Sequence, residues 1–159
     1  MLKVQKIKPE MTYNLRHTIL RPNQSIDNSK YDTDYEENAF HVGAFYNEKL
    51  ISVASFILDK NPDFSFERQY RLRQMATHDA YRKFGAGRAI VDYAENVIKK
   101  QNIPFLWCKA RVNAQGYYEK LGFHTHGDVF DYPPIGLHII MFKKLKKLDR
   151  SIQLLTLNP

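Results

Sequence analysis

The amino-acid sequence predicts a mixed α/β domain, built on a mostly antiparallel sheet with helices on both of its faces. Three observations lead to this prediction. Short runs in which apolar and polar residues alternate recur along the chain, which is typical of strands. Apolar residues at helical spacing over 86–100 predict a long amphipathic helix, and clusters of turn-forming residues separate the runs. The expected order of elements is β-α-loop-β-β-β-α-β-α-β-β, without an internal repeat.

The first expected elements are a strand, a helix and a loop. Alternation over 2–7 predicts the strand. Pro9 then opens a helix over 9–20, because proline is favoured at the first helical position. One face of that helix would carry Met11, Leu15 and Ile19. Residues 21–38 are rich in Pro, Asn, Ser and Asp and predict a loop that can hold a short helix.

The middle of the chain predicts three strands. Runs over 39–46 and 49–58 flank Asn47-Glu48, which suggests a hairpin with a two-residue turn. A second turn over 59–65 precedes a strand over 70–77.

The remaining chain alternates helices and strands. The helix over 86–100 ends in Lys99-Lys100, where the helix dipole favours cations. After it we expect a strand over 105–111, a short helix over 114–120 with Gly122 as its C′ glycine, and two strands within 123–142 around Tyr132-Pro133-Pro134.

Length and charge limit the classes of protein that fit. The 159 residues suit one domain, expected over 1–145, with a basic and apolar tail over 146–159. The net charge is +7, and part of the excess lies in the run 143–147, which fits either a solvated tail or a nucleic-acid patch. No apolar run approaches the roughly 18 residues of a membrane span, and Cys108 is the only cysteine. We therefore expect a cytoplasmic protein with no membrane or nucleic-acid partner, and we leave a homodimer open.

The most informative stretch is Arg82-Lys83-Phe84-Gly85-Ala86-Gly87-Arg88, between the strand over 70–77 and the helix over 86–100. Glycine lets the backbone turn tightly and come close to a ligand. A helix that begins there presents unpaired N–H groups and a partial positive charge, and three cations flank the turn. The stretch therefore predicts a site for an anion, best suited to a pyrophosphate.

Two common phosphate-binding motifs do not fit this turn. A Walker A loop needs Lys and Ser/Thr after its last glycine, whereas Arg88-Ala89 follows Gly87. A dinucleotide-binding fingerprint needs a third glycine where the chain has Ile90.

With these residues the chain resembles the GNAT superfamily of coenzyme A-dependent N-acetyltransferases. The first resembling block runs from Arg71 to Arg88, and a second block, Asn113-Ala114-Gln115-Gly116-Tyr117-Tyr118-Glu119-Lys120-Leu121-Gly122-Phe123, follows about 25 residues later. The similarity spans roughly 1–145, and residues 130–141 look like the ElaA-like branch of the superfamily.

The resemblance implies a cofactor site and an acid. In this family the strand before the turn splays from its neighbour, so main-chain groups of Met75, Ala76 and Thr77 would hold the pantetheine, with a strand N–H at the oxyanion. The turn residues Arg82, Lys83, Phe84, Gly85, Ala86, Gly87 and Arg88 would bind the pyrophosphate. Asn113 would contact the pantetheine arm, although its alternative role is the N-cap of the helix over 114–120. Tyr118 would protonate the departing thiolate, the alternative being a purely structural tyrosine.

The residues do not identify a general base. Glu67 and the scattered histidines, among them His41, His78, His124, His126 and His138, each have a structural interpretation as well, and a water chain stays open. His124 and His126 fall on one face of a strand, but no third metal ligand at a known spacing is evident, so we expect no metal.

An acidic stretch is the one indication about the second substrate. Asp32, Asp34, Glu36 and Glu37 lie in a region that family members use to shape the acceptor site, and an acidic rim would attract a cationic amine. A solvated loop is the alternative interpretation.

The sequence therefore predicts an acyltransferase that moves an acetyl group from acetyl-CoA to a primary amine, on a small molecule or a protein, by direct attack in a ternary complex. The alternatives are a transferase with a longer acyl donor and an acyl-CoA-binding sensor domain without catalysis.

Overall fold

The computed structural model describes residues 1–146, so the tail expected over 146–159 lies outside the described residues except for Lys146. The chain divides into two compact units. The first contains Met1–Leu58 and Arg71–Ala94, and the second contains Asp59–Tyr70 and the described residues from Glu95 onward. The single domain expected over 1–145 stays a prediction beside this division.

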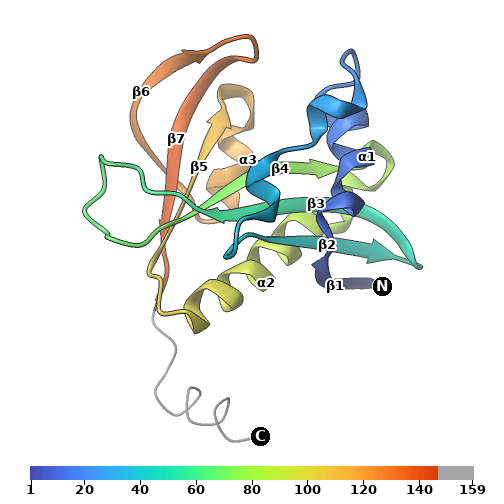
Figure 1. Ribbon diagram of the computed structural model, residues 1–159, viewed down its shortest axis with the longest axis horizontal. Helices are drawn as coiled ribbons and strands as arrows, with labels where there is room; N and C mark the ends of the chain where they lie inside the picture. The colour runs from blue at the N-terminus through green and yellow to red at the C-terminus, as the bar shows by residue number, and fades with distance from the viewer. Residues whose placement is uncertain (147–159) are drawn as a thin grey trace, which may run out of the picture. The chain divides into compact units, whose positions relative to one another are not determined.

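Four neighbouring strands, in the order β1-β2-β3-β4, form the sheet of the first unit (Figure 1). Their bounds are Leu2–Ile7, Phe40–Tyr46, Lys49–Leu58 and Tyr70–Thr77. β2 pairs antiparallel with β1 on one side and with β3 on the other. The strands expected over 2–7, 49–58 and 70–77 are confirmed, and β2 begins one residue later than expected.

The predicted hairpin between β2 and β3 is confirmed. Asn47 and Glu48 both have a positive φ, of 47° and 69°, which matches the two-residue turn whose twist fits antiparallel strands. From Ile51 to Ile57 every residue of β3 is buried, so this strand is covered on both faces and forms the core of the unit.

The helix expected over 9–20 is helical throughout, but it is not a regular α-helix. A 3-10 turn, η1 (Pro9–Thr12), leads into α1 (Tyr13–Leu15) and then into a π segment, η2 (Arg16–Leu20). The π segment begins at Arg16, whose side chain is fully buried. The loop over 21–38 holds two further 3-10 turns, η3 (Ile26–Ser29) and η4 (Asp32–Tyr35).

The second unit contains three strands in the order β5-β7-β6, in which β7 pairs antiparallel with both neighbours. Their bounds are β5 Phe105–Arg111, β6 His124–Tyr132 and β7 Gly136–Lys144. Phe105 packs against Phe64, Phe66 and Phe142, with ring centroids 4.5–5.7 Å apart. A short helix, α3 (Gln115–Lys120), follows the 3-10 turn η6 (Val112–Ala114).

The long helix α2 (Ala86–Lys100) has the predicted bounds; it begins in the first unit and ends in the second. Its buried residues recur at helical spacing, at Ile90, Val91, Ala94 and Ile98. The pairs β1–β2, β2–β3, β5–β7 and β6–β7 are antiparallel, and together with the helices of the described residues they confirm the predicted mixed α/β class.

Candidate active site

The glycine turn joins β4 to α2 in the first unit. Residues 79–84 form a 3-10 turn, η5 (Asp79–Phe84), and Gly85 follows with φ 73° and ψ 23°, in the left-handed region. The amide of Ala89 donates to the carbonyl of Gly85 at 3.1 Å, so the helical hydrogen bonds start there. The left-handed conformation of Gly85 therefore turns the chain directly into the first residues of α2. The unpaired N–H groups of these residues can bind an anion, as they do at other helix N-termini.

The space around Gly85 is open. A Cβ built on this glycine would meet no heavy atom within 4 Å among the described residues. Arg82, Lys83 and Arg88 are exposed around it, and Arg82 forms an ion pair with Asp79 at 2.6 Å. Gly87, two residues later and already in α2, is buried. The residues present thus fit a phosphate: main-chain donors, cations and room that a side chain would fill.

Aromatic rings hold the turn in place. Phe84 stacks on Tyr46 with ring centroids 4.7 Å apart, and Tyr81 lies 5.5 Å from Phe84 and 6.0 Å from Tyr46. The Lys49 ammonium lies over the Tyr81 ring at 5.3 Å. Because Tyr46 ends β2 and Lys49 begins β3, the hairpin tip fixes the turn before any ligand arrives.

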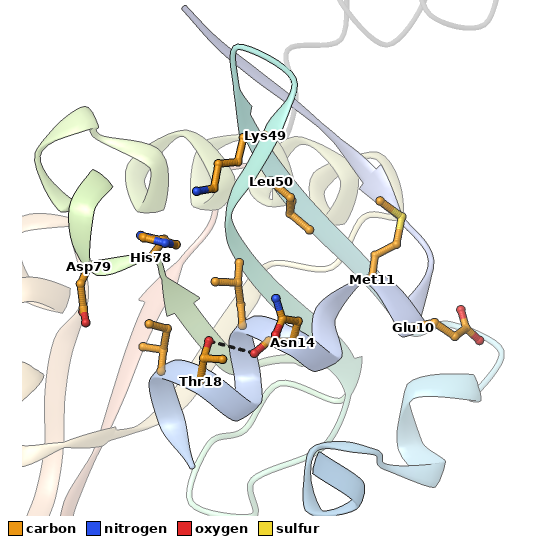
Figure 2. A pocket seen from close by; sticks show the side chains of 10 residues that line it. Glu10, Met11, Asn14, Thr18, Lys49, Leu50, His78 and Asp79 are labelled. Atoms are coloured by element: carbon orange, nitrogen blue, oxygen red, sulfur yellow. Dashed lines mark hydrogen bonds between the residues drawn. The ribbon is translucent and has the colours of Figure 1, made fainter. Parts of the chain in front are cut away.

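A cleft of about 670 Å³ opens beside this turn, within the first unit. Figure 2 shows His78 and Asp79 at one end of it and Glu10 and Met11 at the other. The lining is mixed, since apolar residues of the helical segment and β3 alternate with polar ones: Glu10, Met11, Asn14, Leu15, Thr18, Ile19, Lys49, Leu50, His78 and Asp79. Its volume is that of a small-ligand site.

β4 carries an irregularity that sequence reasoning missed. Gln74 has φ 56°, in the left-handed region, and its side-chain oxygen accepts a hydrogen bond from Arg21 Nη1 at 2.7 Å. A glutamine in the sequence does not indicate this conformation. The conformation costs of order 1–3 kcal/mol and tends to occur at functional sites.

The predicted cofactor-binding residues Met75, Ala76 and Thr77 directly follow Gln74 in β4. Thr77 Oγ1 lies 2.7 Å from Ser52 Oγ, and Ser52 also donates to the carbonyl of Ala76 at 3.3 Å.

The acidic stretch does not form the four-carboxylate rim that we expected. Asp34 is buried, and it accepts two hydrogen bonds, of 2.7 and 2.9 Å, from the guanidinium of Arg16. Because this pair is internal, the expectation that Asp34 faces a substrate is wrong. Asp32, Glu36 and Glu37 are exposed, so only these three carboxylates can form a rim.

His41 completes the buried network around Arg16. Its Nε2 lies 3.0 Å from the carbonyl of Asp34, and its Nδ1 lies 2.7 Å from the Ser55 hydroxyl, which also accepts from Arg16 Nη2. This pattern is complete for the neutral ring with its proton on Nε2. Burial lowers the pKa of His41, and the hydrogen bond and charge of Asp34 only partly oppose it. His41 is therefore a structural histidine.

Asn113 and Tyr118 belong to the second unit. Asn113 lies inside η6, and the N-cap of α3 is Ala114, without a side-chain cap, so the capping role considered for Asn113 is wrong. Within residues 1–146 the exposed side chain of Asn113 makes no hydrogen bond, which leaves its amide available to a ligand.

The end of α3 orients Tyr118. Gly122 has φ 94°, its amide donates to the Glu119 carbonyl at 3.0 Å, and the Phe123 amide donates to the Tyr118 carbonyl at 3.1 Å. This is a Schellman motif, and it confirms Gly122 as the C′ glycine. Phe123 consequently packs edge-on against the Tyr118 ring, with centroids 5.5 Å apart.

Burial raises the pKa of Tyr118 well above 10, and the nearby Cys108 adds to the shift. The phenol therefore keeps its proton throughout the physiological range. It is a weaker acid than a free tyrosine, because the buried surroundings disfavour the charged phenolate.

The remaining histidines have local contacts. His78 accepts from the amide of Ala80, and His138 Nδ1 lies 2.8 Å from the Gly136 carbonyl. His124 and His126 share one face of β6, where both contact the Phe142 ring. Over residues 1–146 no cluster of three or more His, Cys, Asp or Glu residues could hold a metal ion. In the same range no helix is long and apolar enough to cross a membrane.

Comparison with known proteins points to one family. The family profile described as "Acetyltransferase (GNAT) domain" matches residues 9–135. The uncharacterized N-acetyltransferase YitI of Bacillus subtilis is 45% identical over 146 residues, which cover 92% of this chain and 98% of that protein.

Two solved structures illustrate the shared fold. An aminoglycoside 6′-N-acetyltransferase complexed with coenzyme A aligns with a TM-score of 0.70 at 14% identity, covering 92% of this chain and 99% of its own. Escherichia coli ElaA aligns with a TM-score of 0.68 at 17% identity, covering 90% and 99%. Identities this low establish the fold only, so the ElaA-like branch stays a prediction. The extent of the profile match and the identity to YitI together show that this chain belongs to the GNAT acetyltransferase family.

Proposed function

We propose that the protein is an acetyl-CoA-dependent N-acetyltransferase that acts on a primary amine. The observation that supports it most is the open left-handed turn at Gly85, which leads directly into α2 and is surrounded by exposed cations. Such a turn suits the pyrophosphate of coenzyme A. No metal takes part in the proposed reaction.

The proposed reaction is a direct transfer in a ternary complex. The neutral nitrogen of the acceptor attacks the thioester carbonyl, a C–N bond forms, and the C–S bond breaks. The backbone N–H of Met75 would stabilise the oxyanion, and the positive φ of Gln74 supports this role because it interrupts the regular strand just before that amide. The thiolate takes a proton from Tyr118, the nitrogen releases its proton to water, and water returns a proton to the Tyr118 phenolate, which closes the proton balance.

The family resemblance assigns further cofactor contacts. The main chain of Ala76 and Thr77 would hold the pantetheine together with Asn113, whose side-chain amide makes no hydrogen bond within residues 1–146. The turn residues 82–88 would hold the pyrophosphate. These assignments come from the sequence motifs and are open to test residue by residue.

The acceptor amine is a cation in neutral water before it loses a proton. Asp32, Glu36 and Glu37 are exposed and lie on one short segment, so they can raise the local concentration of a small-molecule or protein amine. Asp34 is excluded from this role by its pairing with Arg16.

The alternatives are an acyl-CoA sensor without catalysis and a transferase with a longer acyl donor. Thiol release from acetyl-CoA across a panel of amines, polyamines and peptides separates them from the proposal. Acceptor-dependent release supports the transferase; tight binding of acetyl-CoA without release from any acceptor supports the sensor; faster release from longer acyl-CoA donors supports the second alternative.

A further inference from the structure

The cleft of the first unit has no role in the proposed transfer, and its two ends differ in charge. None of the described residues assigned above to coenzyme A or to the acidic rim lines it. Figure 2 shows Glu10 at one end and His78 at the other. The Lys49 ammonium and the His78 ring both lie against the Tyr81 ring, at 5.3 and 5.2 Å from its centroid. Lys49 and His78 therefore share one end of the cleft.

The carboxylate of Glu10 is held in place without being neutralised. Its Oε1 accepts a hydrogen bond of 2.7 Å from the Tyr35 hydroxyl, which lowers the pKa of Glu10 and keeps it charged at neutral pH. Within residues 1–146 Glu10 forms no ion pair. Tyr35 belongs to the acidic segment 32–37, so this hydrogen bond holds that segment beside the Glu10 end. This end of the cleft attracts a cation.

Two donors at the opposite end lack an acceptor. His78 Nδ1 accepts from the Ala80 amide at 3.2 Å, so the neutral ring carries its proton on Nε2. In the part of the chain that the structure describes, neither this N–H nor the Lys49 ammonium donates a hydrogen bond or joins an ion pair. Asp79 pairs with Arg82 at 2.6 Å and leaves Lys49 unbalanced. This end of the cleft attracts an anionic group.

Apolar side chains line the cleft between its two ends. Ile19 and Leu50 are half-buried, and they pack on the buried cluster of Leu15, Val53 and Ala76. Their remaining surface faces the cleft, where the methylene groups of a ligand can cover it. Each methylene that becomes fully buried strengthens binding about fourfold. The middle of the cleft therefore suits an aliphatic chain.

We propose that the cleft binds a linear aliphatic zwitterion of the ω-amino-acid type. Its ammonium lies at Glu10, its carboxylate lies at Lys49 and His78, and its methylene chain covers the apolar middle. One ligand that reaches both ends fits better than two separate ions, because an exposed ion pair alone contributes little to binding. The inference goes beyond the proposed function, since this binding requires neither acetyl-CoA nor turnover.

An NMR titration with 6-aminohexanoate tests the site. The methyl signals of Ile19 and Leu50, assigned with Ile19→Val and Leu50→Val, are followed as the compound is added. We expect saturable shifts, and a Kd about fivefold or more below the Kd of hexylamine and of hexanoate, each of which lacks one charged end. 4-Aminobutanoate, which is two methylenes shorter, should bind up to about 15-fold more weakly. Absence of saturable shifts, or equally tight binding of hexylamine or hexanoate, overturns the proposal.

Substitutions at the two ends should affect different compounds. Glu10→Gln should raise the Kd of 6-aminohexanoate and hexylamine about 5- to 10-fold and spare hexanoate. Lys49→Gln should raise the Kd of 6-aminohexanoate and hexanoate and spare hexylamine, and Lys49→Arg should restore both values. The exposed Lys3 and Glu119 provide controls outside the cleft, and Lys3→Gln and Glu119→Gln should change no Kd. Equal losses in the controls would mean that net charge alone attracts the compounds, and the site would be wrong.

Coenzyme A is the competitor that separates this site from the cofactor site. The Kd of 6-aminohexanoate should stay within about twofold when coenzyme A is present in excess. Competition between the two compounds would assign Lys49 and His78 to the cofactor instead, and the proposal of a separate site would fall. Failure of every amine to release thiol from acetyl-CoA would count against the proposed function and leave the result of this titration standing.

Discussion

Two glycines with the same φ allow a controlled test of the cofactor site. Gly85 in the turn and Gly127 in β6 both have φ 73°, and a Cβ at either position would meet no heavy atom within 4 Å among the described residues. Gly85→Ala and Gly127→Ala therefore each place a side chain at the same positive φ without a clash. Each substitution should lower the free energy of unfolding by about 1–2 kcal/mol, the cost of a left-handed non-glycine residue.

The two variants should differ only when a ligand is added. At Gly85 the new methyl group fills the space proposed for a phosphate oxygen and displaces one charge-assisted hydrogen bond from the main chain. Such a bond contributes roughly 1.5–3 kcal/mol, so the Kd for coenzyme A should rise about 10- to 100-fold. Gly127→Ala should keep the Kd of the parent protein.

Isothermal titration calorimetry with coenzyme A measures both constants, and thermal unfolding without ligand checks that the two variants are equally destabilised. Equal affinity in the parent and both variants would show that the turn does not bind the cofactor. A loss of affinity in Gly127→Ala as large as in Gly85→Ala would trace the effect to general destabilisation.

Three further predictions concern the buried network and the acid. Asp34→Ala should lower the free energy of unfolding by about 3–5 kcal/mol in chemical denaturation, because it leaves Arg16 buried without its counter-ion. The exposed control Asp32→Ala should change the free energy of unfolding by no more than about 0.5 kcal/mol. Equally small effects of the two substitutions would contradict the buried pair. The pKa of His41 is lowered in the folded state. The stability that neutral His41 contributes is therefore complete above about pH 6.5 and is lost as the pH falls through the folded-state pKa. His41→Gln should reduce the decline of the unfolding free energy that is measured from pH 7 to pH 5. An unchanged decline would place the titration elsewhere. Tyr118→Phe should lower turnover roughly 10²-fold with little change in acetyl-CoA affinity, and because the pKa of Tyr118 is raised, the parent protein should show no loss of rate from phenol ionisation up to about pH 10. Undiminished turnover in Tyr118→Phe would return this residue to a structural role.

The strands and the turn roles of two glycines could be predicted from the sequence because the residue patterns that indicate them are local. Alternation predicted β1 and β4, the run after the Asn47-Glu48 turn predicted β3, and the apolar stripe predicted α2. Gly85 and Gly122 were readable for a related reason: each stands next to a helix terminus and adopts a positive φ there.

The features that were missed depend on contacts between distant residues. Arg16 bonds to Asp34, 18 positions away, and to Ser55, 39 positions away, and no local pattern indicates a buried arginine or the π segment that it begins. The same holds for Gln74, whose unusual φ accompanies a bond to Arg21, 53 positions away. Asn113 was predicted as a possible N-cap because asparagine favours that position. In the structure Asn113 lies inside the 3-10 turn η6, so α3 begins later and its N-cap is Ala114.

The most direct test of the proposed transfer measures both products in one reaction. Free coenzyme A is quantified by thiol titration and the N-acetylated amine by mass spectrometry, with acetyl-CoA and each amine of the panel. We predict that the two products appear in equal amounts, that their formation depends on the acceptor, and that Gly85→Ala slows both alike. Saturable binding of acetyl-CoA with no coenzyme A released above the acceptor-free rate, for every amine in the panel, would contradict the transferase and leave an acyl-CoA-binding module.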